Sequence, residues 1–125
     1  MGNEMKGRLS EEFRNRTKAY AADVIRLNVK LPKAREEVRT LGKQLLRSGT
    51  SVAAQVREAS RARSSAEFVS KLGGVLQEAD ESMLWLELLR EECGIEGSLT
   101  KPLEVGSSEL IAIFTTMINR TKASG

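Results

Sequence analysis

Residues 64–89 read SSAEFVSKLGGVLQEADESMLWLELL, and this stretch decides the fold. Its first four residues have the S-x-x-E form of a capping box, in which the serine and glutamate side chains satisfy free backbone amides at a helix start. Apolar residues at helical spacing follow from Phe68 to Leu89. The stretch therefore predicts a long helix. Cys93-Gly94 predicts its end, because glycine readily takes the left-handed conformation of a helix C-cap.

Three more segments are rich in good helix formers, and the sequence carries no signals typical of strands. The first helix is expected over Ser10–Leu31, with the serine as its N-cap. The second is expected over Lys33–Ala62, with Pro32 at or near its first turn, where proline is tolerated. After a loop over 95–101, Pro102 is expected to open the last helix.

The chain is long enough for one domain and too short for two, at 125 residues. Four helices of this length, joined by short turns, pack most simply as an up-down-up-down antiparallel bundle. We therefore expect an all-α fold, a single four-helix-bundle domain over residues 1–125, with flexible tails over 1–9 and 122–125.

The composition excludes most familiar chemistry. Histidine is absent and cysteine occurs once, so histidine-based catalysis, Cys/His zinc sites and disulfide frameworks lack their residues. We expect no enzymatic activity, no cofactor and no metal, with Cys93 as a small buried apolar residue and the carboxylates of Glu78 and Glu81 facing solvent. No segment is apolar enough for a membrane helix or a signal peptide, which predicts a cytoplasmic protein.

The sequence also resembles a known family. The run QLLRSGTSVAAQVREA at residues 44–59, the run RARSSAEFVSKL at 61–72, and the motifs EADES at 78–82 and WLELL at 85–89 carry the resemblance. They are similar to the bacterial four-helix-bundle proteins related to those encoded in intervening sequences of large-subunit (23S) ribosomal RNA genes. Departures from the family pattern, such as VAAQV at 52–56, are small.

The resemblance implies a four-helix bundle that assembles into a homopentamer and has no established enzymatic activity. A distant relative in the same broad family is the accessory protein of diversity-generating retroelements, a basic pentamer that contacts a reverse transcriptase and nucleic acid. By this distant analogy, the resemblance implies a reverse transcriptase, and RNA or DNA, as partners.

One face of the second segment is basic. Residues 33–64 carry eight basic and three acidic residues, a net charge of +5, whereas 65–97 carry two basic and eight acidic residues, a net charge of −6. Two interpretations stay open. The opposite charges pair the helices within or between subunits, or the basic face binds the phosphate backbone of RNA or DNA without sequence specificity. The cations of this face, which we call the basic stripe, are Arg39, Lys43, Arg47, Arg57, Arg61 and Arg63.

The third segment is apolar on all sides between Met83 and Leu89, and one bundle interior cannot cover every one of these side chains. Part of the segment is therefore expected to contact another subunit. Trp85 fits an ordinary core position as well as an interface anchor. Leu46 lies within the basic stripe, outside the expected core. The residues expected at the contact between subunits are Leu46, Leu84, Trp85, Leu88 and Leu89.

The sequence SGTS at residues 48–51 lies inside the second helix, where glycine costs about 1 kcal/mol relative to alanine. We interpret these small residues as a place where a neighbouring helix comes close, with a bend in the helix as the alternative. Gly73-Gly74 in the third segment receives the same interpretation.

Overall fold

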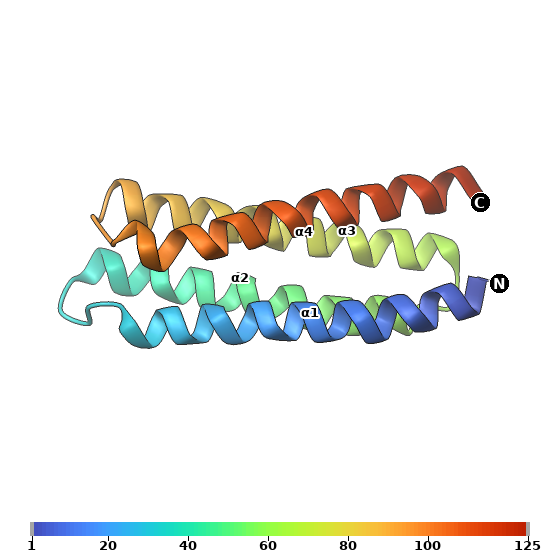
Figure 1. The fold of residues 1–125 in the computed structure, drawn as a ribbon, viewed down its shortest axis with the longest axis horizontal. Helices are drawn as coiled ribbons and strands as arrows, with labels where there is room; N and C mark the ends of the chain where they lie inside the picture. The colour runs from blue at the N-terminus through green and yellow to red at the C-terminus, as the bar shows by residue number, and fades with distance from the viewer. Residues whose placement is uncertain (1, 125) are drawn as a thin grey trace.

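Four helices make up the chain in the computed structural model, which describes the backbone of residues 2–124 and the side chains of residues 11–124. Successive helices run antiparallel, and both chain ends lie at the same end of the bundle (Figure 1). The described residues contain no strand. The expected all-α, up-down-up-down bundle is therefore confirmed, with helices α1 (Gly2–Lys30), α2 (Glu36–Ser60), α3 (Ser65–Glu91) and α4 (Gly97–Ser124).

The four helices do not contact one another equally. Helix α2 packs extensively against α3, and the pairs α1–α2 and α3–α4 follow closely. The pair α1–α4, which closes the bundle, makes a far smaller contact. A seam between α1 and α4 therefore runs along one side of the molecule (Figure 1).

The ends of α3 form as the sequence predicts. The side-chain oxygen of Ser64 accepts a hydrogen bond from the backbone amide of Glu67 at 3.0 Å, which is the cap expected from the S-x-x-E motif. Helix α3 ends at Glu91, and Gly94 follows with φ at 70°. That positive φ is the conformation for which glycine was expected at this position.

The starts of the other helices differ from the expectation. Helix α1 begins at Gly2 and runs through Ser10, so Ser10 is not an N-cap; residues 3–9 are mostly good helix formers and contain no proline. The flexibility expected for 1–9 and 122–125 stays a prediction, and Met1 and Gly125 lie outside the described residues.

Pro32 lies in the connection before α2 and not in its first turn. Helix α2 begins only at Glu36: its N-cap Arg35 is extended, and the Arg35 carbonyl accepts the hydrogen bond of the Arg39 amide at 3.1 Å. The carbonyl of Lys33 instead accepts a hydrogen bond from the Arg39 side chain at 2.9 Å. Helix α4 begins earlier than expected, whereas α2 begins later. The amides of Leu99 and Thr100 bind the Glu96 carbonyl and start the helix, so the expected loop ends earlier and Pro102 is the sixth helical residue.

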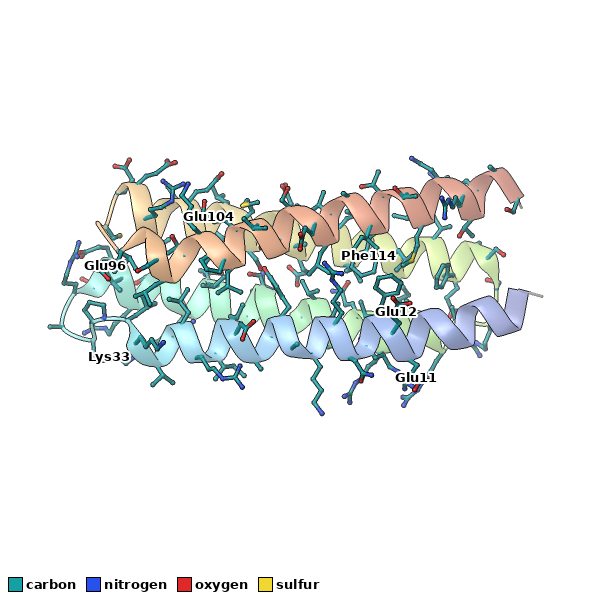
Figure 2. The ribbon with its side chains drawn as sticks, in the orientation of Figure 1. Glu11, Glu12, Lys33, Glu96, Glu104 and Phe114 are labelled. Carbon is teal, nitrogen blue, oxygen red and sulfur yellow. The ribbon has the colours of Figure 1, made fainter. Side chains whose placement is uncertain are left out.

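The core is built from the apolar stripes of all four helices. Leu45, Val52, Val56 and Ala59 are among the residues that supply the buried face of α2. Near the end that carries the termini, the rings of Phe13 and Phe114 lie 5.8 Å apart, and Figure 2 shows Phe114 pointing between the helices.

A buried polar layer crosses the middle of this core, with one hydroxyl from each helix. The oxygens of Ser48 and Ser82 lie 2.7 Å apart between α2 and α3, and those of Tyr20 and Ser107 lie 2.6 Å apart between α1 and α4. Burial raises the pKa of Tyr20 above its ordinary value, so the phenol stays protonated and can donate a hydrogen bond. Because each hydroxyl must meet its partner, the layer favours one register of the helices over others.

The small residues of α2 do allow a neighbouring helix to come close. A Cβ atom at Gly49 would lie 2.8 Å from a methyl group of Val24, and one at Gly42 would lie 2.9 Å from the side-chain oxygen of Asn28. The expected close approach is therefore confirmed for α2. It is wrong for Gly73, where a Cβ atom would meet nothing within 4 Å, whereas one at Gly74 would meet the flexible side chain of Gln55.

An ion pair joins α3 and α4 near their connection. Arg90 donates two hydrogen bonds to the mostly buried carboxylate of Glu104, at 2.9 and 3.0 Å. These hydrogen bonds hold the pKa of Glu104 below its ordinary value of 4.5, although desolvation opposes the shift. The pair therefore contributes stability above about pH 4.5 that is lost as the pH falls through the lowered pKa.

Replacing Arg90 with glutamine is expected to lower the urea midpoint of unfolding at pH 7, and this loss is expected to narrow as the pH is lowered from 7 to 2. At neutral pH the variant leaves a carboxylate without its partner, while protonation of Glu104, as the pH falls through its lowered pKa, removes that charge in both proteins. Arg26→Gln is the matched control, since its partner Asp23 and Arg26 itself are both well exposed. A loss of equal size at both pH values for Arg90→Gln would contradict the assigned role of Glu104.

Candidate nucleic-acid interface

The six cations of the basic stripe are all exposed, four on α2 and two at the connection that follows it. Helix α2 ends at Ser60, so Arg61 lies just beyond the helix in which the sequence places it. The partners of the six cations divide them into two groups, and this division decides which of them are available to a ligand.

Arg47 is committed to the acidic face of α3. Its guanidinium donates to Glu78 at 3.1 and 3.3 Å and to Glu81 at 2.8 Å. These hydrogen bonds raise the pKa of Arg47. Glu78 is buried, so the expectation that it faces solvent is wrong: Arg47 reaches across from α2 and covers it. One part of the basic stripe therefore pairs the two central helices within the subunit.

The remaining cations are less engaged. Arg63 lies 3.8 Å from Glu67, four residues along the chain, and Arg39 donates only to the neutral carbonyl of Lys33. Within residues 11–124, Lys43, Arg57 and Arg61 make no ion pair with a carboxylate. The uncompensated charge therefore lies toward the two ends of the basic stripe.

The residues expected at a subunit contact fall into exposed and buried sets. Leu84 of α3 is 46% exposed and Leu46 of α2 is also exposed, whereas Trp85 and Leu88 are partly buried. The indole nitrogen of Trp85 is buried and has no hydrogen-bond partner among the described residues. Leu89 is completely buried in the core of its own subunit, so the structure leaves it no surface for a second copy.

Two exposed apolar residues of α1 were not singled out from the sequence. Ile25 and Val29 are 47% and 73% exposed, one turn apart. Gly42 and Gly49 of α2 come close to Asn28 and Val24 of α1. Leu46 lies between these two glycines, so it lies at about the same height along the bundle as Ile25 of α1. The available signal was that Ile25 and Val29 are apolar but lie off the core stripe of the first helix.

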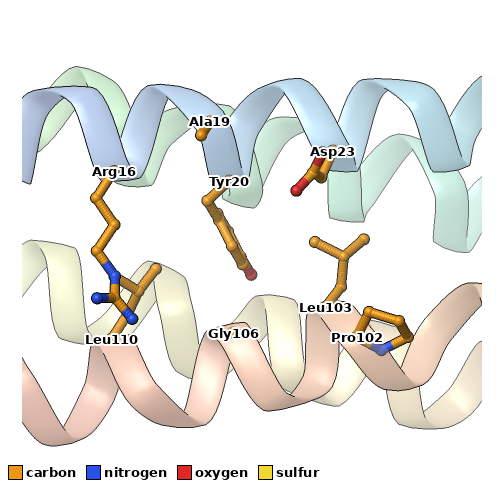
Figure 3. A pocket seen from close by; sticks show the side chains of 8 residues that line it. All are labelled: Arg16, Ala19, Tyr20, Asp23, Pro102, Leu103, Gly106 and Leu110. Atoms are coloured by element: carbon orange, nitrogen blue, oxygen red, sulfur yellow. The ribbon is translucent and has the colours of Figure 1, made fainter.

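The seam between α1 and α4 contains a hollow of about 150 Å³ (Figure 3). Tyr20 points across it from α1 toward α4. The ionisable residues at its rim are paired: Arg16 with Glu109 at 3.1 Å, and Asp23 with Arg26 at 2.9 Å. We therefore place the candidate interface on α2 and not in this hollow.

No group of three or more Cys, Asp or Glu side chains among the described residues is arranged to hold a metal ion. None of the helices, over the residues described, is long and apolar enough to cross a membrane. Cys93 is buried, as expected, and has no disulfide partner.

The fold and its charged faces define a class, an antiparallel four-helix bundle whose two central helices carry opposite charge. The family model for the 23S rRNA-intervening sequence protein matches residues 11–116, and the chain belongs to this family. It is similar to a crystal structure from Bacteroides thetaiotaomicron, that of a protein of unknown function from the S23 ribosomal protein family. The identity is 32%, the TM-score is 0.76, and the similarity covers 84% of this chain and 96% of the other. No curated protein matches the chain.

Proposed function

We propose that the protein is a non-catalytic homo-oligomer, a pentamer by family resemblance, that binds the phosphate backbone of nucleic acids as an adaptor or accessory factor. The nucleic-acid part of the proposal rests on one observation, the exposure of Lys43, Arg57 and Arg61 without carboxylate partners. These three cations are exposed and form no ion pair with a carboxylate among the residues whose side chains are described. A run of uncompensated cations attracts phosphates and releases their counterions on binding.

The binding we propose is independent of base sequence. Single-strand platforms depend on exposed aromatic side chains that stack with bases. Here Tyr20, Phe68 and Phe114 are buried, and Phe13 and Trp85 are partly buried against the core. The α2 surface therefore offers charge without a base-reading element.

The proposed assembly uses two different apolar faces. The first face, on α1 and α2, contains Ile25, Val29 and Leu46, with the cation Lys43 one turn from Leu46. The second face, on α3, contains Leu84 and the partly buried Leu88 and Trp85. Each face is an exposed apolar patch of the kind that subunit contacts cover.

The charges around the two faces are complementary. Asp80 lies one turn before Leu84 on α3 and Glu87 one turn after it, whereas the α1–α2 face has basic neighbours. Because the two faces differ, a contact between them joins copies head to tail, and repeated head-to-tail contacts close into a ring when the rotation allows. Leu46, in the middle of the basic stripe, then packs against a neighbour, while Lys43 on one side of it and Arg57 and Arg61 on the other lie at the rim of the contact and remain open for nucleic acid.

A second function is favoured by the Arg47 contacts. Arg47 joins Glu78 and Glu81 across α2 and α3, which shows that at least one cation of the basic stripe serves protein structure. Under this alternative the protein is a protein-interaction scaffold, and its charged faces only organise the assembly. The two functions differ in how nucleic-acid affinity depends on salt.

Replacing Lys43, Arg57 and Arg61 together with glutamine is expected to flatten the dependence of nucleic-acid affinity on salt. Each lost phosphate contact lowers the slope of log K against log salt by about 0.9 on duplex DNA, or by about 0.7 on a single strand. Fluorescence anisotropy with labelled duplex and single-stranded oligonucleotides at several salt concentrations measures this slope.

The matched control replaces three exposed cations of α4, Lys101, Arg120 and Lys122, with glutamine. It removes the same net charge and is expected to change the slope far less. Equal slopes for the two triple variants would show that total charge, and not the α2 face, sets the affinity. Absence of binding by the wild-type protein would leave the scaffold function.

A further inference from the structure

We infer that the hollow beside the α1–α2 connection is a phosphate site, and that it seats a single phosphate group of the nucleic acid that the protein binds. The inference rests on the proposed function for the source of the phosphate. The site lies at the end of the bundle where α1 ends and α2 begins, near the place where Figure 2 labels Lys33.

Three cations from two successive segments converge on this hollow. Lys33 comes from the connection, and Arg39 and Lys43 come from successive turns of α2. Among its lining residues, all of which the structure describes, there is no carboxylate. Three like charges around one concavity repel one another, and an anion seated between them removes that repulsion.

The apolar part of the lining comes from Leu31, Pro32 and Val38. Its volume of about 190 Å³ is below the roughly 300–1,000 Å³ typical of pockets for drug-sized ligands. The hollow therefore suits a small anionic group better than a whole nucleotide. A phosphate brings several oxygens that accept hydrogen bonds from ammonium and guanidinium donors together.

Two of the cations are held in place by backbone carbonyls, one in the last turn of α1 and one in the connection. The Nζ atom of Lys33 donates to the carbonyl of Asn28 at 2.6 Å, and Arg39 donates to the carbonyl of Lys33 at 2.9 Å. Both acceptors are neutral, so the positive charges remain. An ammonium group has three donors and a guanidinium has five, which leaves donors free for a ligand.

The carboxylates nearest in sequence do not neutralise this group. Glu36 and Glu37 lie in the first turn of α2, outside the lining of the hollow. Glu37 pairs with Arg35 at 2.8 Å. The hollow therefore carries a local excess of positive charge, at the end of the basic stripe beside the α1–α2 connection.

Equilibrium dialysis with radiolabelled inorganic phosphate, at constant ionic strength, tests the site directly on the full chain. We expect one saturable phosphate per subunit. Lys33→Gln and Lys43→Gln are each expected to weaken this binding about tenfold, the loss of one charge-assisted hydrogen bond of the weaker kind. Lys30→Gln is the matched control, because Lys30 is an exposed lysine at the same end of the bundle that does not line the hollow. It should leave the affinity within twofold.

A competition arm identifies the source of the phosphate. Short oligonucleotides with and without a 5′-phosphate are added to the dialysis. Displacement by both assigns the site to backbone phosphodiesters, and displacement by the 5′-phosphorylated form alone assigns it to a chain end. Thermal unfolding of each variant confirms that the fold is retained.

The outcomes separate this inference from the proposed function. No saturable phosphate binding, or equal binding by all variants, would overturn the phosphate site even if oligonucleotides bind through Arg57 and Arg61. Phosphate binding that depends on Lys33 and Lys43, with no binding of any oligonucleotide, would support the site and overturn the nucleic-acid function.

Discussion

Replacing Leu84 with lysine is expected to reduce the protein in solution from the proposed ring to a single subunit of 13.8 kDa. Leu84 is 46% exposed at the centre of the α3 face. A lysine there is tolerated by the isolated subunit, because Asp80 and Glu87 lie one turn away on the same helix. In the ring it places a positive charge against the basic α1–α2 face of the neighbour and removes apolar contact area.

The control is Val105→Lys, which makes the same kind of change at an apolar residue of α4 that is 57% exposed and lies outside both proposed faces. Static light scattering gives the particle mass of each protein. We expect a mass near five subunits for the wild-type protein and for Val105→Lys, and one subunit for Leu84→Lys. A wild-type protein that is monomeric at working concentration contradicts the ring. Two variants that both remain assembled contradict the use of the α3 face.

Replacing Gly49 with leucine is expected to destabilise the fold by about 3 kcal/mol or more, at or beyond the upper end of the usual cost of overpacking. A Cβ atom alone at this position would lie 2.8 Å from a methyl group of Val24. Val24 is completely buried and β-branched, so it has no alternative position into which it can move. The extra side chain therefore has to push α1 away from α2. Urea unfolding at a fixed protein concentration measures the loss.

Gly73→Ala is the comparison for this variant, and its expected effect has the opposite sign. Gly73 is exposed, and an added Cβ meets nothing within 4 Å, so the change keeps only the gain in helix propensity of about 0.5–1 kcal/mol. If Gly49→Leu stabilises the fold, as Gly73→Ala is expected to, then helix propensity and not close approach governs the glycines of this bundle.

The helices could be predicted from the sequence because their signals are local. The Ser64 cap and the positive φ of Gly94 depend on residues within one or two turns, and both are observed. The start of α4 differs from the expectation because Pro102, which is typical of a first turn, lies inside the helix here. Glu96 and Gly97 begin the helix one turn earlier, at the cost of one intrahelical hydrogen bond at the proline.

For the candidate interface, the sequence predicts a basic face of α2 but not the partners of its cations. The periodicity of α2 places its cations together, but it does not reveal which of them find a carboxylate on another helix. The pairing of Arg47 with Glu78 depends on the relative position of α2 and α3 along their axes. The residue pattern of a single helix carries no information about that position. The hollow at Lys33 depends on how the connection folds back over the end of α1.

The small contact between α1 and α4 has a consequence for how the molecule fluctuates. Helices α2 and α3 share the largest contact. They are also joined by the Ser48–Ser82 hydrogen bond and by the ion pair of Arg47 with Glu78. Helix α1 packs mainly against α2, and helix α4 packs mainly against α3. We therefore expect partial opening to begin by separating α1 from α4, and the amide protons of the α2–α3 hairpin to exchange with solvent last.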